Sequence, residues 1–113
     1  FLEKYLKIAH IFQEDSRIVG IFGSYAKGNE KKGSDLDVFI IGPKKENDYD
    51  SKGKIYSIDV SIKYFSDKEF IQLVKEKNNL VMEMIKSHIL IFGYERFTNI
   101  IWKEHYGFDK MVP

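Results

Sequence analysis

The chain has 113 residues, 43% of them hydrophobic and 15% aromatic, which is enough to build the core of one small globular domain, residues 1–113. Eighteen lysines and arginines against 17 aspartates and glutamates leave a net charge of +1, which argues against strong nucleic-acid binding through charge. No apolar run is long enough to cross a membrane, and the lack of cysteine excludes disulfides and thiol chemistry, so we expect a cytoplasmic protein.

Apolar side chains recur at helical spacing near the start of the chain, at Leu2, Tyr5, Leu6, Ala9 and Phe12. This spacing predicts an amphipathic helix that ends near Asp15 and covers one face of a sheet. The next apolar run, residues 18–22, is short and partly β-branched, which predicts a buried strand.

A Gly-Ser pair follows this run directly. Gly23 allows a ligand to approach the backbone, and Ser24 is a favourable N-cap residue for a short helix that Gly28 would close. The first turn of such a helix presents free N–H groups and the positive end of the helix dipole. Both suit an anion such as phosphate.

Two aspartates stand at the head of the next apolar run, residues 38–41, which predicts a second buried strand. Asp35 and Asp37 are two residues apart, so on a strand they share a face, with side chains roughly 7 Å apart. Carboxylates this close repel each other unless a cation lies between them, and hard oxygen ligands favour Mg²⁺. The residues predict a metal–nucleotide site; the alternative is a structural α+β domain in which the aspartates cap a strand and a turn.

This pattern resembles the signature of the polymerase-β-type nucleotidyltransferases: Gly23-Ser24, ten residues, then Asp35-Leu36-Asp37, with Ser34 before the aspartates. Within that superfamily the chain looks most like the minimal nucleotidyltransferases, small single-domain proteins that are often antitoxin partners of HEPN-domain proteins in bacteria and archaea. The resemblance is sharpest over residues 23–41 and extends more loosely to Asp59 and to residues 88–106.

A third acidic residue lies further along the chain. Residues 43–54 are polar and predict a loop, either a long hairpin connection or a border of the substrate site. Residues 55–65 alternate between apolar and polar side chains, with Asp59, Ser61 and Lys63 on the polar face, and predict a strand. An aspartate within a strand indicates either an exposed polar face or a specific role. The resemblance implies the role, because the family places its third carboxylate on a following strand.

The remaining segments complete an α+β fold. Ser66 and Glu69 form a capping-box pattern, Asn78-Asn79 separates two helices, and residues 88–92 predict a strand. A closing helix over residues 95–106 would bury Phe97, Ile100, Ile101 and His105, and we expect the histidines to be packing or surface residues. This order of elements predicts a nucleotidyltransferase fold, a mixed sheet of about four strands with helices packed on it.

The resemblance also implies an activity: Mg²⁺-dependent transfer of a nucleoside monophosphate, AMP from ATP, to a hydroxyl acceptor with release of pyrophosphate. Asp35, Asp37 and Asp59 would bind two Mg²⁺ ions and carry the catalysis. Gly23, Ser24 and Lys27 would bind the nucleotide, although Lys27 is equally well interpreted as a solvated lysine.

The family precedent for the acceptor is a tyrosine side chain of a HEPN-type toxin partner. The alternative is a non-catalytic antitoxin-like module that masks such a partner. The resemblance leaves open whether the chain also forms a homo-oligomer.

Overall fold

The computed structural model describes residues 2–107. Its helices and strands are, in chain order, α1 (Leu2–Ile11), β1 (Ile18–Phe22), α2 (Gly23–Lys27), β2 (Leu36–Ile41), α3 (Tyr49–Ile55), β3 (Val60–Phe65), α4 (Asp67–Lys75), α5 (Asn79–Lys86), β4 (Ile89–Phe92) and α6 (Tyr94–Glu104). Among these described residues, no helix has the length and apolar character needed to span a bilayer.

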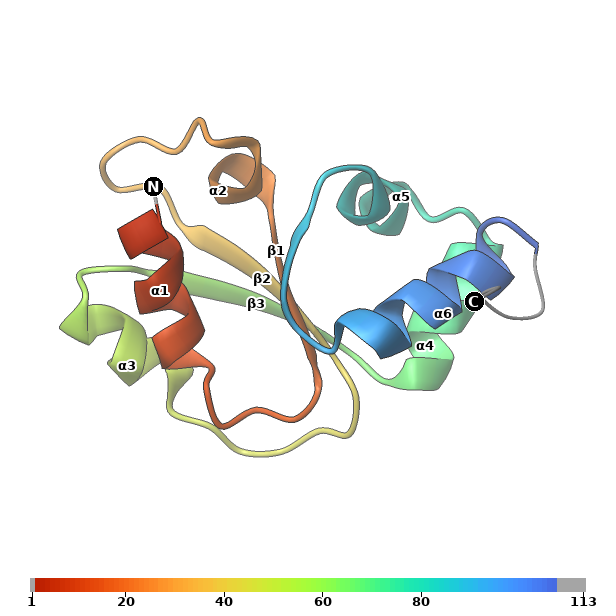
Figure 1. The fold of residues 1–113 in the computed structure, drawn as a ribbon, viewed down its shortest axis with the longest axis horizontal. Helices are drawn as coiled ribbons and strands as arrows, with labels where there is room; N and C mark the ends of the chain where they lie inside the picture. Colours follow the sequence, from red (N-terminus) through yellow and green to blue (C-terminus); the bar gives the residue numbers. More distant parts are fainter. Residues whose placement is uncertain (1, 108–113) are drawn as a thin grey trace.

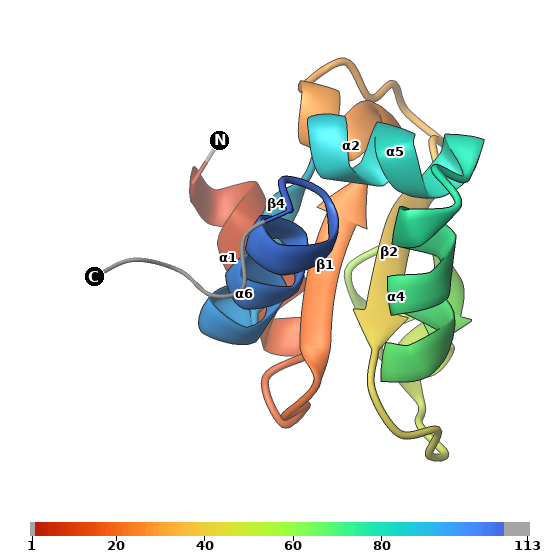
Figure 2. The same ribbon diagram turned by 90° about the vertical axis from the view of Figure 1, so that its right-hand side faces the viewer.

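The described chain forms three layers around a four-stranded sheet of order β3-β2-β1-β4 (Figure 1). Strand β1 is antiparallel to β2 and β4, whereas β2 and β3 are parallel, so the mixed sheet of about four strands is confirmed. Helices α1 and α3 lie on one face of the sheet, and α4, α5 and α6 lie on the other (Figures 1 and 2).

Alternation along the two central strands divides the core between these layers. Val19 and Val38 pack toward α1 and α3, while Ile18, Phe39 and Ile41 pack toward α4, α5 and α6. Because both faces are covered, β1 is buried at every position, which explains its continuous apolar run.

The segment between β2 and β3 differs from the predicted loop and strand. Residues 49–55 form α3, so the hairpin connection is wrong and the strand begins only at Val60. Parallel strands require a crossover connection, and α3 supplies it. Ile55, predicted to start the strand, is 77% exposed at the end of α3.

The first helix is shorter than predicted and turned about its axis. It ends at Ile11 rather than near Asp15, and Leu6 is 61% exposed. The residues buried from this segment are Ile8, Ile11 and Phe12. The aliphatic positions at 8 and 11, rather than Leu6, therefore set the face that meets the sheet.

The C-terminal half follows its sequence signals closely. Ser66 and Glu69 form the predicted capping box at the start of α4, and the Asn78 side chain caps α5. Phe97 and Ile101 are buried on α6, whereas His105 comes after the helix and is exposed, so its predicted place on the apolar face is wrong.

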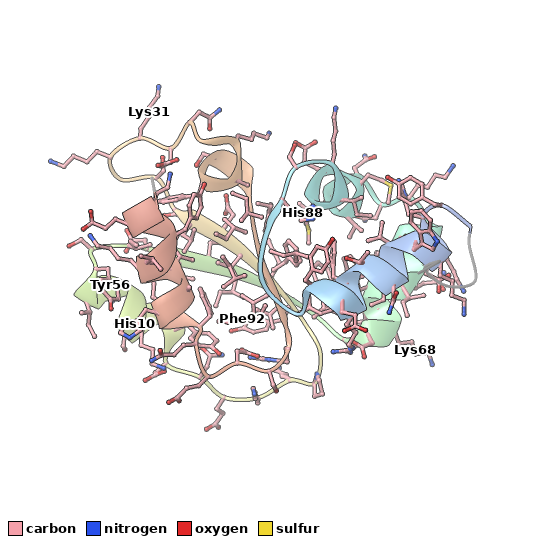
Figure 3. The ribbon with its side chains drawn as sticks, viewed as in Figure 1. His10, Lys31, Tyr56, Lys68, His88 and Phe92 are labelled. Carbon is pink, nitrogen blue, oxygen red and sulfur yellow. The ribbon has the colours of Figure 1, made fainter. Side chains whose placement is uncertain are left out.

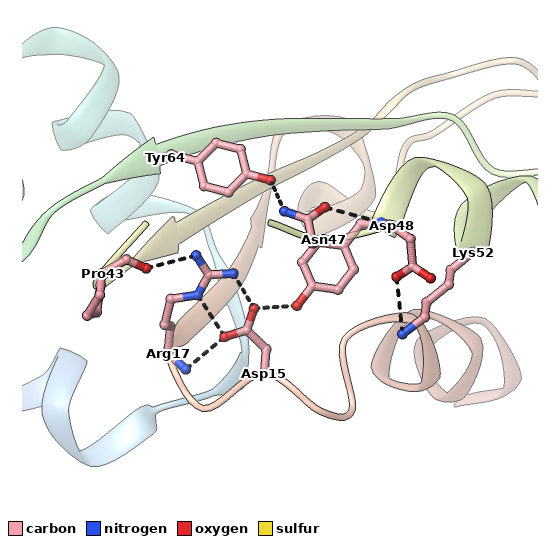
Figure 4. A network of polar contacts seen from close by, with 8 residues as sticks. Asp15, Arg17, Pro43, Asn47, Asp48, Lys52 and Tyr64 are labelled. Carbon is pink, nitrogen blue, oxygen red and sulfur yellow. Dashed lines mark hydrogen bonds and ion pairs between the residues drawn. The ribbon is translucent and has the colours of Figure 1, made fainter. Parts of the chain in front are cut away.

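A buried polar network joins two loops at the end of the sheet where β1 starts and β2 stops (Figure 4). Arg17 donates to Asp15 through Nε at 2.9 Å and through Nη2 at 2.6 Å, and it reaches the Pro43 carbonyl at 3.1 Å. The Tyr49 hydroxyl also donates to Asp15. The network ties the entry of β1 to the exit of β2 and the start of α3.

Candidate functional site

The candidate site lies where β1 ends and where β2 and β3 begin. In the antiparallel β1–β2 pair, Phe22 is opposite Asp37, and α2 follows Phe22 without a break. In the parallel β2–β3 pair, the Leu36 amide donates to the Asp59 carbonyl at 2.8 Å. The structure therefore brings the glycine–serine turn, the paired aspartates and the Asp59 backbone to the same end of the sheet.

Gly23 and Asp37 are in direct contact. Gly23 has a φ of +70°, and a Cβ atom placed on it would overlap Oδ2 of Asp37. Only glycine suits this backbone conformation and this spacing at once. The turn therefore leaves room for the carboxylate that an ion or a nucleotide would approach.

Helix α2 begins differently from the prediction. Its N-cap is Phe22, with no side-chain capping hydrogen bond, and Ser24 lies inside the helix, so the N-cap role predicted for Ser24 is wrong. Gly28 does end the helix, in a left-handed conformation with φ of 73°. The Ser24 hydroxyl is thus not used to cap α2, and the structure gives it no role in the stability of that helix.

The carboxylates of Asp35 and Asp37 interact with each other. Burial raises the pKa of Asp37, the neighbouring charge of Asp35 raises it further, and Lys63 partly offsets both effects. Ser61 is opposite Asp37 in the sheet and Lys63 is two residues further along β3, so the three share one face. Asp35 and Lys63 are exposed, while Asp37 is half-buried.

The donor set at this end of the sheet fits a hard divalent cation. Among the described residues, the Asp37 carboxylate accepts no hydrogen bond and forms no ion pair, and the Asp35 charge acting on it is of like sign. A half-buried carboxylate with a raised pKa and no hydrogen-bond donor gains from a bound cation. Asp35 and Asp37 are the two residues that could hold it.

Asp59 is less closely joined to that pair. Its backbone borders the start of β2, but its side chain is exposed, and in residues 2–107 no three acidic, histidine or cysteine side chains gather closely enough to hold a metal ion. Its role as a third ligand stays a prediction.

Lys27 is paired with a residue that the sequence did not single out. Its Nζ lies 3.0 Å from Oε1 of Glu83, which links α2 to α5 across 56 residues of sequence. Glu83 is on the exposed side of an ordinary amphipathic helix, so no local pattern marks it. Lys63 was visible in the sequence, because it lies on the same polar strand face as Asp59.

His88 lies at this end of the sheet, directly before β4, which pairs with the end of β1, whereas His10 lies on α1. His10 is hydrogen-bonded to the Tyr56 hydroxyl at 2.6 Å between α1 and the end of α3, and His88 contacts the Met84 carbonyl at 2.9 Å (Figure 3). Both contacts fit the packing and surface roles that the sequence predicted.

Comparison of this chain with known protein families gives a match that covers the candidate site. The family model described as "Polymerase beta, Nucleotidyltransferase" matches residues 6–97, which include every residue of the candidate site. No match to this sequence was found among curated proteins.

One similar solved structure is described as "Crystal structure of the toxin-antitoxin with AMP-PNP". It is 14% identical to this chain, with a TM-score of 0.60 over 89% of this chain and 83% of the other. At that identity the likeness concerns the fold.

Proposed function

The chain belongs to the polymerase β nucleotidyltransferase family, and we propose that it transfers AMP from ATP to a hydroxyl group on a protein acceptor, releasing pyrophosphate. The observation that carries this proposal is the Asp37 carboxylate, held against the Gly23 turn and beside Asp35 at the end of the sheet. Such a pair of carboxylates next to a glycine turn suits a metal-bound triphosphate.

Asp35 and Asp37 would hold Mg²⁺, with Asp59 as the third carboxylate of a two-ion site. When bound, Mg²⁺ neutralises charge on the triphosphate and favours ionisation of the attacking hydroxyl. The Gly23 turn has no side chain, so the outer phosphates can approach the backbone N–H groups there, with the Ser24 hydroxyl as a further donor.

The transfer itself forms one bond and breaks one bond. The acceptor oxygen attacks the α-phosphorus, and the bond from that phosphorus to the bridging oxygen breaks, so that pyrophosphate leaves. The acceptor proton must go to a base, and the exposed Asp59 carboxylate at the start of β3 would accept it.

The acceptor and the partner are inferred from the resemblance to minimal nucleotidyltransferases and from the similar toxin–antitoxin structure. We infer that the partner is a HEPN-type toxin and that its accepting group is a tyrosine hydroxyl. The second candidate function is an antitoxin module that masks the toxin without turnover. The exposed Asp59 side chain, which is not gathered with the other two carboxylates, favours this alternative.

The Asp37→Asn variant tests the catalytic proposal. Changing a residue that only orients a metal ligand typically costs about 10- to 100-fold in affinity or activity, so loss of a direct ligand should lower AMP transfer by about 100-fold or more. Transfer is measured with α-labelled ATP, Mg²⁺ and the co-expressed toxin. Thermal stability should stay equal or rise, because the change removes a half-buried charge that is repelled by Asp35.

Asp50→Asn is the matched control, since Asp50 is an exposed aspartate in the first turn of α3. It should transfer AMP at the wild-type rate. Full transfer by Asp37→Asn would show that the aspartate pair is not the active site. Toxin binding by the wild-type protein with no label transfer would support the masking module instead.

A further inference from the structure

The ion pair between Lys27 and Glu83 connects the candidate nucleotide site to a helix that is distant in sequence. Lys27 is in the last turn of α2, four residues after Gly23, and Glu83 is in the middle of α5. The two helices lie side by side (Figures 1 and 2), and the Nζ–Oε1 distance is 3.0 Å. A carboxylate of α5 is therefore paired with the lysine at the end of the short helix that begins at the glycine–serine turn.

The two partners differ in how firmly they are held. Helix α5 is capped by the Asn78 side chain and anchored by Val81 and Met84, which are fully buried, so the position of Glu83 is set by the core. Lys27 ends a five-residue helix that has no side-chain cap, and its long side chain is 45% exposed. Lys27 is the partner that can move.

The charges decide what would move it. Exposed ion pairs contribute little to stability, and both side chains here are about half exposed. A triphosphate carries several negative charges, so it competes well with one carboxylate for the same ammonium group. While Lys27 remains with Glu83, the same carboxylate also repels an incoming triphosphate.

We propose that Glu83 is a positioning residue of the nucleotide site, which holds Lys27 away from the phosphates until the nucleotide displaces it. The proposal rests on the proposed function, because it takes the ligand of the turn to be Mg²⁺-bound ATP. Nucleotide binding then exchanges the Lys27–Glu83 pair for a Lys27–phosphate contact and releases α2 from α5. Glu83 therefore lowers the affinity for nucleotide.

Calorimetric titration of the full chain with Mg²⁺ and AMP-PNP, which is not turned over, tests this. Glu83→Gln removes the competing charge and should lower the Kd by about 2- to 5-fold, the range expected for an exposed ion pair. Glu83→Asp keeps the charge on a shorter side chain, so its Kd should lie between those of the wild-type protein and Glu83→Gln. The gain should shrink in high salt, since exposed charges are screened.

Two further variants show whether the effect acts through Lys27. Lys27→Met should raise the Kd, and adding Glu83→Gln to it should give no further gain. Glu95→Gln is the matched control, because Glu95 on α6 forms no ion pair within residues 2–107 and its loss changes the net charge equally. It should leave the Kd unchanged.

The outcomes separate this proposal from the proposed function. If wild-type protein binds Mg²⁺ and AMP-PNP but Glu83→Gln binds no more tightly, the role of Glu83 is overturned and the nucleotide site stands. If the wild-type protein does not bind AMP-PNP at all, both are overturned. A purely structural pair would lower the thermal stability of Glu83→Gln without raising its affinity.

Discussion

At the scale of single residues, Gly23 and Asp37 form the closest-fitting part of the site. Asp37 is half-buried with a raised pKa, and its Oδ2 lies only 2.4 Å from the position that a Cβ atom on residue 23 would take. The fold thus holds a carboxylate where burial and a like charge disfavour its ionised form. The bound cation that we propose for this site would offset that cost.

Gly23→Ala should abolish Mg²⁺-dependent nucleotide binding. The added Cβ would displace the Asp37 carboxylate, and the positive φ would cost about 1–2 kcal/mol of unfolding free energy in addition. Denaturant unfolding and calorimetric titration measure the two effects separately.

Gly28→Ala is the matched control for that change. Gly28 has nearly the same backbone conformation, with φ of +73°, but a Cβ added there would meet no atom of a distant residue within 4 Å. It should therefore lose about 1–2 kcal/mol of stability and keep its nucleotide affinity. Equal affinity loss in both variants would show that backbone strain, and not the contact with Asp37, is responsible.

At the scale of elements, the network of Asp15, Arg17 and Tyr49 fixes the end of the sheet opposite the site. Both charged side chains of the ion pair are at most 3% exposed. A buried pair of this kind is weak evidence for added stability, but removing one partner leaves the other charge buried and unpaired. The network joins the loop before β1 to the loop after β2 and to the start of α3.

Arg17→Met should destabilise the protein by about 3–5 kcal/mol, because the Asp15 carboxylate would lose its ion pair and the two hydrogen bonds from the guanidinium in the interior. This is a large part of the stability of an average domain, and urea unfolding would measure it.

Arg96→Met provides the comparison. Arg96 pairs with Asp67 at a site where both side chains are nearly half exposed, and such pairs contribute about 0–1 kcal/mol. A similar loss of unfolding free energy in the two variants would contradict the role of Arg17 as the partner of a buried carboxylate.

At the scale of the whole molecule, the same network should set the pH range of stability. Burial by itself raises the pKa of Asp15, but hydrogen bonds from Arg17 and Tyr49 overcome it and bring the pKa from 3.8 to about 2. Burial and Asp15 raise the pKa of Tyr49 from 10.0 to about 12. The folded state thus favours the ionised form of Asp15 and the neutral form of Tyr49.

A plot of stability against pH should therefore fall at both ends, with an acid limb due to Asp15 and an alkaline limb due to Tyr49. The contribution of Asp15 should be complete above about pH 4 and lost as the pH falls through 2, because the unfolded state takes up the proton first. That of Tyr49 should be complete below about pH 10 and lost toward pH 12, because the unfolded state ionises first. Asp37 acts in the opposite sense to Asp15, since its raised pKa adds stability as the pH falls.

Thermal midpoints measured across the pH range would check this. Tyr49→Phe should flatten the alkaline limb and make the acid limb shallower, because Asp15 loses one of the hydrogen bonds that lower its pKa and keeps those from Arg17. If Tyr49→Phe lost as much stability between pH 10 and 12 as the wild-type protein, other groups would have to account for that limb.

The sequence alone determined those features that depend on local chemistry. The glycine–serine turn, the two aspartates at the head of β2, the capping box at Ser66 and the helix break at Asn78-Asn79 follow from residue type and spacing. Alternation along residues 60–65 likewise marked Lys63 as sharing a face with Ser61. These signals extend over a few residues, so no distant contact is needed to interpret them.

Only the tertiary structure decided which distant residues meet. A polar stretch at 43–54 is compatible with a hairpin or a crossover, and the parallel pairing of β2 and β3 selects the crossover helix α3. The contact between Glu83 and Lys27 and the exposure of Leu6 were likewise decided by how the helices pack, which the sequence pattern does not specify. Periodicity fixes which side chains share a face, but the packing of complete elements fixes what each face contacts.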